Sequence, residues 1–453
     1  MNRLATGRLL SFVAGLSLIA TLAGGGSALG STHRRSISSP NLSASERQQT
    51  TLRRNFGLAS DLASVRSTKN TVAGKNSALG IPLTENEQSN IQSRDRVLPV
   101  IQRARSVLEA DAKFAGLYID QRAGGTLVIM MTNASLTPTE LAAVGPTSVY
   151  GPKIRRATYS LAHLTDELAY VGKAQVDQRG AARYIQSSSI DIPANTVVLS
   201  VDPNAPRSAE DELRQLYKNR RGLTITRSTI VMSYKTTNRD LKSGLAYGGE
   251  YISRDSATPG VYAGCSMGFA NYTNSANQHY SLTAGHCGNG TWRQGLNASG
   301  NVLGGTHNNE FTGRSSGHCE CVAVGPIPQN VATRGILGTG NAVIGMTHIG
   351  YGNSLYETAV GQRVCLSGGT SADHGSDLNC GAITSNRGDT TVEGWTLVDA
   401  LTTNNTSFSG DSGGPLENAT YHGLLGFLSS GGPYGLSTFS KSLYASELGI
   451  NFN

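Results

Sequence analysis

All six cysteines of this 453-residue chain lie in its second half, between residues 265 and 380. An even number of cysteines confined to one region is typical of disulfide-bonded domains that fold in an oxidising compartment. In the same half, short β-prone runs alternate with turns rich in Gly, Asn and Ser up to residue 453. Many short strands with frequent turns predict an all-β sandwich or barrel. We therefore expect residues 243–453 to form one disulfide-bonded β domain.

The N-terminus has the pattern of a secretory signal. Arg3 and Arg8 precede an apolar run over 9–23, and small residues follow at 24–30. A basic, then an apolar, then a small-residue segment predicts a signal peptide over residues 1–30 that is removed on secretion. The apolar run is shorter than the ~20 residues that cross a bilayer, and no later run reaches that length. We therefore expect a secreted, extracellular protein that has no membrane partner.

The region between the signal and the β domain divides in two. Residues 31–90 are rich in Ser, Asn, Arg and Gln without sustained hydrophobic periodicity, so we expect a flexible leader there. From about residue 93, apolar residues recur first at helical spacing and then in strand-like runs. Residues 91–242, which contain no cysteine, are therefore expected to be a small α+β domain with a connector. The predicted helices cover 97–108, 157–171 and 209–217, and the predicted strands cover 114–120, 126–132 and 196–201.

The charge of the chain is distributed unevenly. The net charge is +7, from 38 Lys and Arg against 31 Asp and Glu. Up to residue 242 there are 31 basic against 18 acidic residues, and from residue 243 there are 7 against 13. A basic chain can bind nucleic acid, but the basic half lacks clustered Lys and Arg with interleaved aromatic residues. We therefore expect no nucleic-acid partner and interpret the two halves as complementary parts of one molecule.

Two short segments indicate chemistry. They are Leu-Thr-Ala-Gly-His-Cys-Gly at 282–288 and Ser-Gly-Asp-Ser-Gly-Gly-Pro at 409–415. A serine hydroxyl is a poor nucleophile unless a base removes its proton, and a tetrahedral intermediate needs N–H donors directed at its oxyanion. Ser412 is the candidate nucleophile and His286 the candidate base. The surrounding glycines let the backbone turn tightly, so that the N–H groups of Gly410 and Ser412 form the candidate oxyanion hole.

These two motifs resemble those of the chymotrypsin-like serine proteases, within the secreted branch that includes the streptogrisins and α-lytic protease. The resemblance covers about 245–453 and extends weakly to 90–225. The further segments that resemble this branch are its disulfide loop at 364–381, its mature N-terminal region at 247–250 and 265–269, and its propeptide at 114–120.

The resemblance implies an all-β fold of two six-stranded antiparallel β-barrels, the trypsin-like protease domain, with the active site between them. It also implies a small α+β propeptide domain that assists folding as an intramolecular chaperone and then inhibits. It places Ser430, Gly431 and Gly432 on the strand that pairs with the substrate backbone and lines the pocket for its side chain. Since 403–409 contain no acidic residue, we expect cleavage after apolar or aromatic residues. The cysteines implied in disulfides are Cys265, Cys287, Cys365 and Cys380.

The acid of the triad is where the sequence departs from the family. The family's Asp precedes a short apolar strand, and the residue that matches it is Glu320, within His-Cys-Glu-Cys-Val-Ala-Val at 318–324. Glutamate serves as the triad acid in some α/β-hydrolases. The extra methylene requires a shift of the backbone or of His286. The alternative acids are Asp389, Asp399 and Glu310.

Two further departures lie beside these motifs. A Cys319–Cys321 bridge requires a bend, because strand residues two apart have Cα atoms ~6.5–7 Å apart. We expect no metal at 318–321, because zinc sites space their cysteines by two to four residues and need a second ligand pair. The branch pairs its buried aspartate with an Arg after the first Cys of its loop. A leucine stands there in this sequence, and Arg363 is the candidate partner of Asp411.

We therefore interpret the chain as a secreted serine endopeptidase made as a preproprotein, a hydrolase that acts as a monomer on protein or peptide substrates without a cofactor. Two alternatives stay open. One is a catalytically inactive homologue that binds a partner through the same cleft, and the altered acid is its support. The other is a secreted esterase. Labelling by a fluorophosphonate tests the first alternative, and hydrolysis of casein tests the second.

Overall fold

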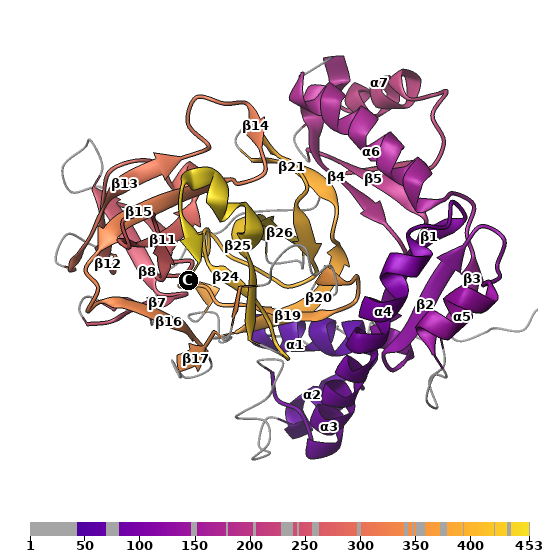
Figure 1. Cartoon of the computed structure of the whole chain (residues 1–453), viewed down its shortest axis with the longest axis horizontal. Coiled ribbons are helices and arrows are strands. Elements are labelled where there is room, and N and C mark those ends of the chain that lie inside the picture. The colour runs from indigo at the N-terminus through magenta and orange to yellow at the C-terminus, as the bar shows by residue number, and fades with distance from the viewer. Residues whose placement is uncertain are drawn as a thin grey trace, which may run out of the picture. The chain divides into compact units, whose positions relative to one another are not determined.

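The computed structural model describes residues 43–453 with gaps, and Figure 1 labels its helices and strands. The gaps are 69–80, 146–151, 178–179, 203–204, 228–238, 242–243, 256–261, 297–299, 339–342, 347, 350–357, 372–377, 393, 421, 433–435 and 453. The predicted signal peptide, residues 1–30, lies outside the described residues. Among the residues that are described, no helix is both long and apolar enough to cross a bilayer.

The last part of the chain forms a closed barrel of six antiparallel strands. They pair in the order β25-β24-β19-β20-β23-β26, and β25 also pairs with β26, so the sheet closes on itself. Closure leaves no free edge among these strands, and buried Leu366, Leu416 and Phe439 pack inside. The strands are β19 (Arg363–Leu366), β20 (Asn379–Ser385), β23 (Leu401–Thr403), β24 (Pro415–Asn418), β25 (Gly423–Gly432) and β26 (Leu436–Lys441), and β18 (His348–Ile349) pairs with β25 from outside the barrel.

A second, eight-stranded antiparallel sheet forms a half-barrel, and all its strands except β27 precede the closed barrel in the sequence. Its order is β27-β10-β11-β15-β13-β12-β8-β9. The two-barrel, trypsin-like fold class that the sequence predicts is thereby confirmed for residues 239–453, which we call the C-terminal region. The strands are β8 (Tyr251–Asp255), β9 (Tyr262–Ser266), β10 (Tyr272–Thr273), β11 (His279–Ala284), β12 (Thr291–Gln294), β13 (Val302–Asn309), β15 (Cys321–Ile327) and β27 (Asn451–Phe452). A small sheet joins β7 (Ala246–Gly248), β16 (Ala332–Leu337) and β17 (Val343–Gly345).

One hydrophobic cluster joins the half-barrel to the closed barrel. Phe269 and Leu282 from the first sheet pack with Leu424 and Phe427 from β25. One backbone hydrogen bond, from Ser266 N–H to the Ser412 carbonyl, joins the half-barrel to the segment that precedes β24. Another, from Gly268 N–H to the Leu282 carbonyl, lies within the half-barrel. This packing holds the end of β11 close to the turn that precedes β24.

The N-terminal region, residues 43–227, contains two sheets covered by helices. The first is β1-β2-β3, and the second contains β4-β5-β6 with α6 and α7 against it. β4 also pairs with β21 of the C-terminal region, so one six-stranded sheet, β14-β22-β21-β4-β5-β6, includes strands of both regions (Figure 1). The elements are α4 (Leu98–Leu108), β1 (Phe114–Asp120), β2 (Thr126–Met131), α5 (Pro138–Val144), β3 (Lys153–Arg156), α6 (Leu161–Val176), β4 (Ile185–Asp191), β5 (Thr196–Val201), α7 (Ser208–Leu216) and β6 (Leu223–Arg227), with β14 (Ser316–Gly317), β21 (Gly388–Val392) and β22 (Trp395–Leu397) from the C-terminal region.

The leader over 31–90, expected to be flexible, instead contains helices in both of the stretches that the structure describes, 43–68 and 81–90. These are α1 (Ala44–Asn55), α2 (Leu62–Thr68) and the first part of α3 (Glu85–Arg94). Capping boxes begin α1 and α3, in which Ser43 or Thr84 and the glutamate three residues later satisfy each other's backbone N–H groups. Buried Leu52, Phe56 and Leu83 pack against Cys365 and Cys380 of the closed barrel. The expectation of a flexible leader is therefore wrong for these residues, because a few apolar residues bury against a distant part of the chain.

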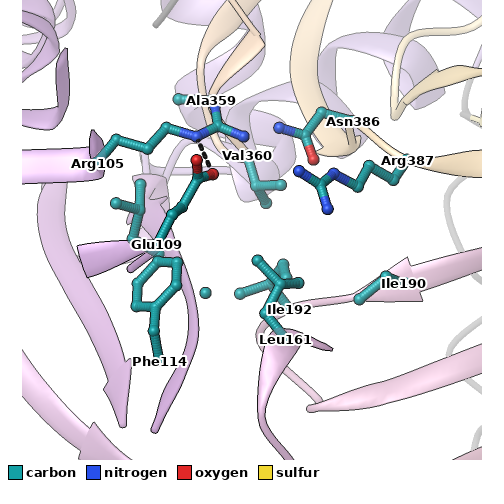
Figure 2. A pocket seen from close by; sticks show the side chains of 12 residues that line it. Arg105, Glu109, Phe114, Leu161, Ile190, Ile192, Ala359, Val360, Asn386 and Arg387 are labelled. Carbon is teal, nitrogen blue, oxygen red and sulfur yellow. Dashed lines mark hydrogen bonds and ion pairs between the residues drawn. The ribbon is translucent and has the colours of Figure 1, made fainter. Parts of the chain in front are cut away.

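One part of the contact between the two regions, around Phe114 and Val360, encloses only a small cavity. Figure 2 shows a cavity of about 20 Å³ lined by side chains of both regions, among them Phe114, Leu161 and Ile192 on one side and Val360 and Arg387 on the other. A volume of this size holds about one water molecule. We therefore interpret this cavity as part of a packed interface and not as a ligand site.

Candidate active site

Two neighbouring strands bring a histidine and a glutamate together. His286 lies in a 3₁₀ turn, η5 (Gly285–Cys287), that directly follows β11, whereas Glu320 directly precedes β15. Since β11 and β15 are antiparallel partners, the end of the first strand lies beside the start of the second. The Gly285 N–H donates to the Glu320 carbonyl at 3.2 Å and fixes this approach.

The side chains of Ser412, His286 and Glu320 form a chain of hydrogen bonds. Ser412 Oγ lies 3.0 Å from His286 Nε2, and His286 Nδ1 lies 3.1 Å from Glu320 Oε1. The same Oε1 accepts the backbone N–H of His286 at 2.6 Å. The Glu320 side chain is 0% exposed and the imidazole is 16% exposed. These contacts have the geometry of a nucleophile, a base and an acid that orients the base.

The backbone around Glu320 is held from two sides. Its N–H donates to Ser440 Oγ at 2.9 Å, and that hydroxyl lies 2.9 Å from Ser429 Oγ. A disulfide joins Cys319 to Cys321, so the chain bends at Glu320, directly before β15 begins. Because both sulfur atoms are in the disulfide, neither is a thiolate ligand for a metal. The bend is where the chain accommodates the longer side chain of glutamate.

The three alternative acids are engaged elsewhere. One of them, Asp389, is buried, and burial raises the pKa of its carboxyl group to about 6. Each of these carboxylates has partners other than His286: Glu310 pairs with Arg314, Asp399 pairs with Lys441 and accepts from the Tyr444 hydroxyl, and Asp389 accepts the Asp399 N–H.

Glycines shape the turn that carries Ser412. Gly410 has φ +96° and Gly413 has φ +83°, a conformation that glycine adopts without strain. A Cβ at Gly413 would also collide with the Ser266 carbonyl and the Thr283 hydroxyl. Among the described residues, the N–H groups of Gly410 and Ser412 have no backbone acceptor. Both groups are therefore available to a ligand at the nucleophile.

Asp411 holds this turn through its carboxylate, and no arginine among the described residues pairs with it. Oδ1 accepts the N–H groups of Thr370 and Ser371 at 2.9 and 2.8 Å, and Oδ2 accepts the Phe408 N–H at 2.8 Å and the Ser371 hydroxyl. Burial raises the pKa of Asp411, and these donors oppose the rise. Arg363, the partner expected from the sequence, instead pairs with Asp95 at 3.0 Å.

A cleft of about 480 Å³ opens beside the three side chains. His286, Ser412 and Gly410 line it together with Ser430 and Gly431 of β25. Gly432 belongs to the same strand, where it pairs with Leu436, but it does not line the cleft. The predicted nucleophile, base, oxyanion donors and two of the three predicted substrate-binding residues therefore face one cleft.

Of the two remaining disulfides, one lies at the cleft and the other joins two strands of the closed barrel. Cys265 of β9 is joined to Cys287, directly after His286, and Cys365 of β19 is joined to Cys380 of β20. Cys265 and Cys287 also line the cleft. Within the described ranges, no group of three or more His, Cys, Asp or Glu side chains is arranged to hold a metal ion.

Some supporting residues were not recognised from the sequence. Ser440 accepts from Glu320, and Ser371 donates to Asp411. Neither lies in a motif, because each is brought to its partner by strand pairing or by a loop far along the chain. Serines in β-rich segments carry no local signal of such a role.

Comparison with known proteins shows a likeness in fold to bacterial serine proteases. Three solved structures illustrate it. Thermobifida fusca protease A is 24% identical with a TM-score of 0.36, and the match covers 46% of this chain and 98% of that protein. A glutamic acid-specific serine protease is 21% identical with a TM-score of 0.37, covering 46% and 100%, and the chymotrypsin of Cellulomonas bogoriensis is 21% identical with a TM-score of 0.35, covering 46% and 98%. No protein-family model and no curated protein matches the sequence.

Proposed function

We propose that the chain is a secreted serine endopeptidase, synthesised with a signal peptide and a propeptide, that hydrolyses peptide bonds through an acyl-enzyme. The observation that carries the proposal is the hydrogen-bonded series Ser412, His286 and Glu320 at the edge of a cleft. The free N–H groups of Gly410 and Ser412 support it, because peptide hydrolysis needs donors for an oxyanion. The three disulfides favour an extracellular location.

In the first half of the proposed reaction, Ser412 Oγ attacks the substrate carbonyl carbon while His286 Nε2 takes the hydroxyl proton. The carbonyl oxygen becomes an oxyanion that accepts from the Gly410 and Ser412 N–H groups. The buried Glu320 carboxylate stabilises the imidazolium through Nδ1–H. The C–N bond then breaks, the proton moves from Nε2 to the leaving amine, and the acyl group stays on Ser412 as an ester.

In the second half, a water molecule replaces the amine. Nε2 of His286 takes a proton from the water as its oxygen bonds to the acyl carbon, and the same oxyanion donors act again. The C–Oγ bond breaks, Ser412 regains its proton from Nε2, and the carboxylic acid product leaves. His286 thus returns to its starting state, and no redox partner or cofactor is required.

The N-terminal region is proposed to act as the propeptide. β4 pairs with β21, and Gln186 and Ser187 of β4 line the cleft beside Thr390 and Thr391 of β21. Substrate that approaches along this side of the cleft would meet the N-terminal region. This contact supports inhibition by the uncleaved chain, and the shared six-stranded sheet supports a role as an intramolecular chaperone for the C-terminal region.

The experiment is activity-based labelling of the secreted, matured protein. A fluorophosphonate should label the wild type at Ser412, the label should be absent from Ser412→Ala, and casein should be cleaved. No labelling of the matured wild type would support the inactive homologue. Labelling with ester hydrolysis but no cleavage of casein or peptides would support the esterase.

A further inference from the structure

A buried arginine lies outside the protease domain that the sequence predicts. Arg239 is 0% exposed, although it lies four residues before the expected domain start at residue 243. One amino group, Nη1, donates to Ser367 Oγ at 2.7 Å and to the carbonyls of Gly249 and Gly368 at 3.3 Å. These acceptors belong to two separate segments of the C-terminal region, one at residue 249 and one at 367–368.

The other amino group of Arg239 reaches a third segment. Nη2 donates to the carbonyls of Leu337 and Gly338, each at 3.1 Å. All five acceptors are neutral oxygen atoms, so the guanidinium acts as a fixed fork of donors. The next residue also joins the C-terminal region, since the Asp240 carboxylate accepts the Leu296 N–H at 2.7 Å. Both residues are therefore bound to the β-barrels.

The segment that Arg239 holds is linked by hydrogen bonds to the turn that carries Ser412. Ser367 and Gly368 accept from Arg239, and the residues that follow them supply donors to the turn. Gly369 N–H donates to Ser266 Oγ at 2.8 Å, and Ser266 Oγ donates in turn to the Gly410 carbonyl at 2.8 Å. The N–H groups of Thr370 and Ser371 donate to Asp411, as described above.

We propose that Arg239 is a positioning residue for the nucleophile turn, and that it therefore stays with the protease when the propeptide is removed. The proposal rests on the proposed function. Arg239 fixes residues 367–368 and thereby the donors at 369–371. These donors hold Gly410, through Ser266, and Asp411, the two residues that directly precede Ser412. The mature N-terminus then lies before Asp240 and not at residue 243 or later.

The shape of the guanidinium explains why this position needs arginine. Its two amino groups bond to acceptors of different segments, Nη1 to Ser367 and Gly368 and Nη2 to Leu337 and Gly338. A lysine ammonium is a single point charge and lacks this fork of two amino groups. There is also no spare room, because a Cβ at Gly249 would meet both Nη1 of Arg239 and Oγ of Ser367.

The test compares Arg239→Lys and Arg239→Ala with wild type in the full chain, matured as the wild type matures. Arg314→Ala, which removes a guanidinium that is 59% exposed, is the control and should keep wild-type kinetics. We expect kcat and the fluorophosphonate labelling rate of Arg239→Lys to fall at least about tenfold, since a misplaced catalytic group costs up to ~100-fold. KM should stay within about twofold, because the substrate contacts are intact.

Two further readouts separate positioning from general stability. Added guanidinium or methylguanidinium should restore labelling to Arg239→Ala, whereas it should not restore labelling to Ser412→Ala. N-terminal sequencing of the mature wild type should give a start at or before Arg239. This last measurement decides the proposal even if both variants fail to fold.

The outcomes separate this inference from the proposed function. A mature wild type that begins after residue 239 and is fully active overturns the inference, as does an Arg239→Lys enzyme with wild-type kcat. In either case the labelled wild type leaves the protease function standing. A matured wild type that begins before Asp240 but is not labelled overturns the proposed function instead.

Discussion

Oε1 of Glu320 accepts two hydrogen bonds from His286, one from its backbone N–H at 2.6 Å and one from Nδ1 of its ring at 3.1 Å. One carboxylate oxygen thus fixes both the main chain and the imidazole of the same residue. Because Nδ1 donates to the buried acid, Nε2 is left to accept the proton of Ser412. The longer side chain of glutamate is compatible with this geometry because the chain bends between Cys319 and Cys321.

Replacing Glu320 by Gln should lower kcat by several orders of magnitude. The amide keeps the size of the side chain but no longer stabilises the imidazolium or enforces the tautomer, and loss of the orienting acid has cost on the order of 10⁴ in a related triad. KM should change little, because Glu320 is buried behind His286. Steady-state kinetics on a chromogenic peptide measures both.

Glu320→Asp is the matched variant. It keeps the charge but shortens the side chain, so the carboxylate lies farther from His286 in a loop that fits the longer residue. We expect partial activity, well above that of Glu320→Gln. If Gln at this position leaves turnover within about tenfold of wild type, far from the usual ~10⁴ loss, Glu320 is not the acid.

Ser412→Ala should abolish peptide hydrolysis and, if maturation is autocatalytic, leave the secreted precursor uncleaved. The substitution removes Oγ, the atom 3.0 Å from the His286 base, and leaves the turn otherwise unchanged. Electrophoresis of the culture medium shows the precursor, and a peptide assay shows the activity. Full activity of the purified variant would exclude Ser412 as the nucleophile.

The sequence singled out three residues that the structure brings within hydrogen-bonding distance, Ser412, His286 and Glu320, but not the residues that support them. His286 and Ser412 lie in dense local motifs, and Glu320 lies at a fixed place before an apolar strand. Arg363 could not be paired correctly, because its partner Asp95 is 268 residues away and is brought close only by tertiary packing. The contacts of Arg239 were missed for the same reason, because its acceptors come from three segments that are far apart in the sequence.

The fold of the N-terminal region was predicted in part. Apolar periodicity identified β1, β2, β5, α4 and α7, with ends that differ by a few residues. β4, Ile-Gln-Ser-Ser-Ser-Ile-Asp at Ile185–Asp191, was missed because it has few apolar residues and is a strand through its pairing with β5 and β21. α6 begins later than expected, at Leu161, because Ser160 caps it.

Substrate preference should be for apolar or aromatic residues before the cleaved bond. Ser430 and Gly431 leave room in the cleft, and Phe408, Leu428 and Leu436 add apolar surface. Among the described residues that line the cleft there is no Asp or Glu, so none of them offers an opposite charge to a Lys or Arg side chain. Profiling with a peptide library measures the preference, and strong selection of Lys or Arg would contradict the prediction.

Isolated residues 90–225 should inhibit the mature enzyme, and less strongly at high salt. The excess of basic residues before residue 243 and of acidic residues after it favours association. Salt screens such attraction over about 8 Å at physiological ionic strength. Inhibition constants at low and high salt test this. An unchanged constant would mean that packing, and not net charge, drives the association.

Acid pH should strengthen the association between the two regions through Asp389. This residue lies on β21, and its carboxylate closely approaches Gly172 of α6, where a side chain would have no room. Burial raises the pKa of Asp389 from 3.8 to about 6, and the neighbouring Asp399 adds to the rise, while the Asp399 N–H and His318 oppose it. When α6 leaves, water reaches the carboxylate and its pKa falls toward the usual value.

The direction of the pH dependence follows from the difference in the pKa of Asp389 between the associated and the separated regions. The associated state holds the proton of Asp389 more tightly than the separated state does. The affinity between the two regions is therefore greatest below about pH 4, falls as pH rises from about 4 to about 6, and is constant above about pH 6. A difference of about two pKa units corresponds to at most about a hundredfold in affinity. The inhibition constant of residues 90–225 measured from pH 4.5 to 7 gives the profile, and Asp389→Asn should flatten it while keeping the affinity seen at low pH. If wild type and Asp389→Asn have the same pH dependence, the carboxylate of Asp389 is not the group that titrates between the two regions.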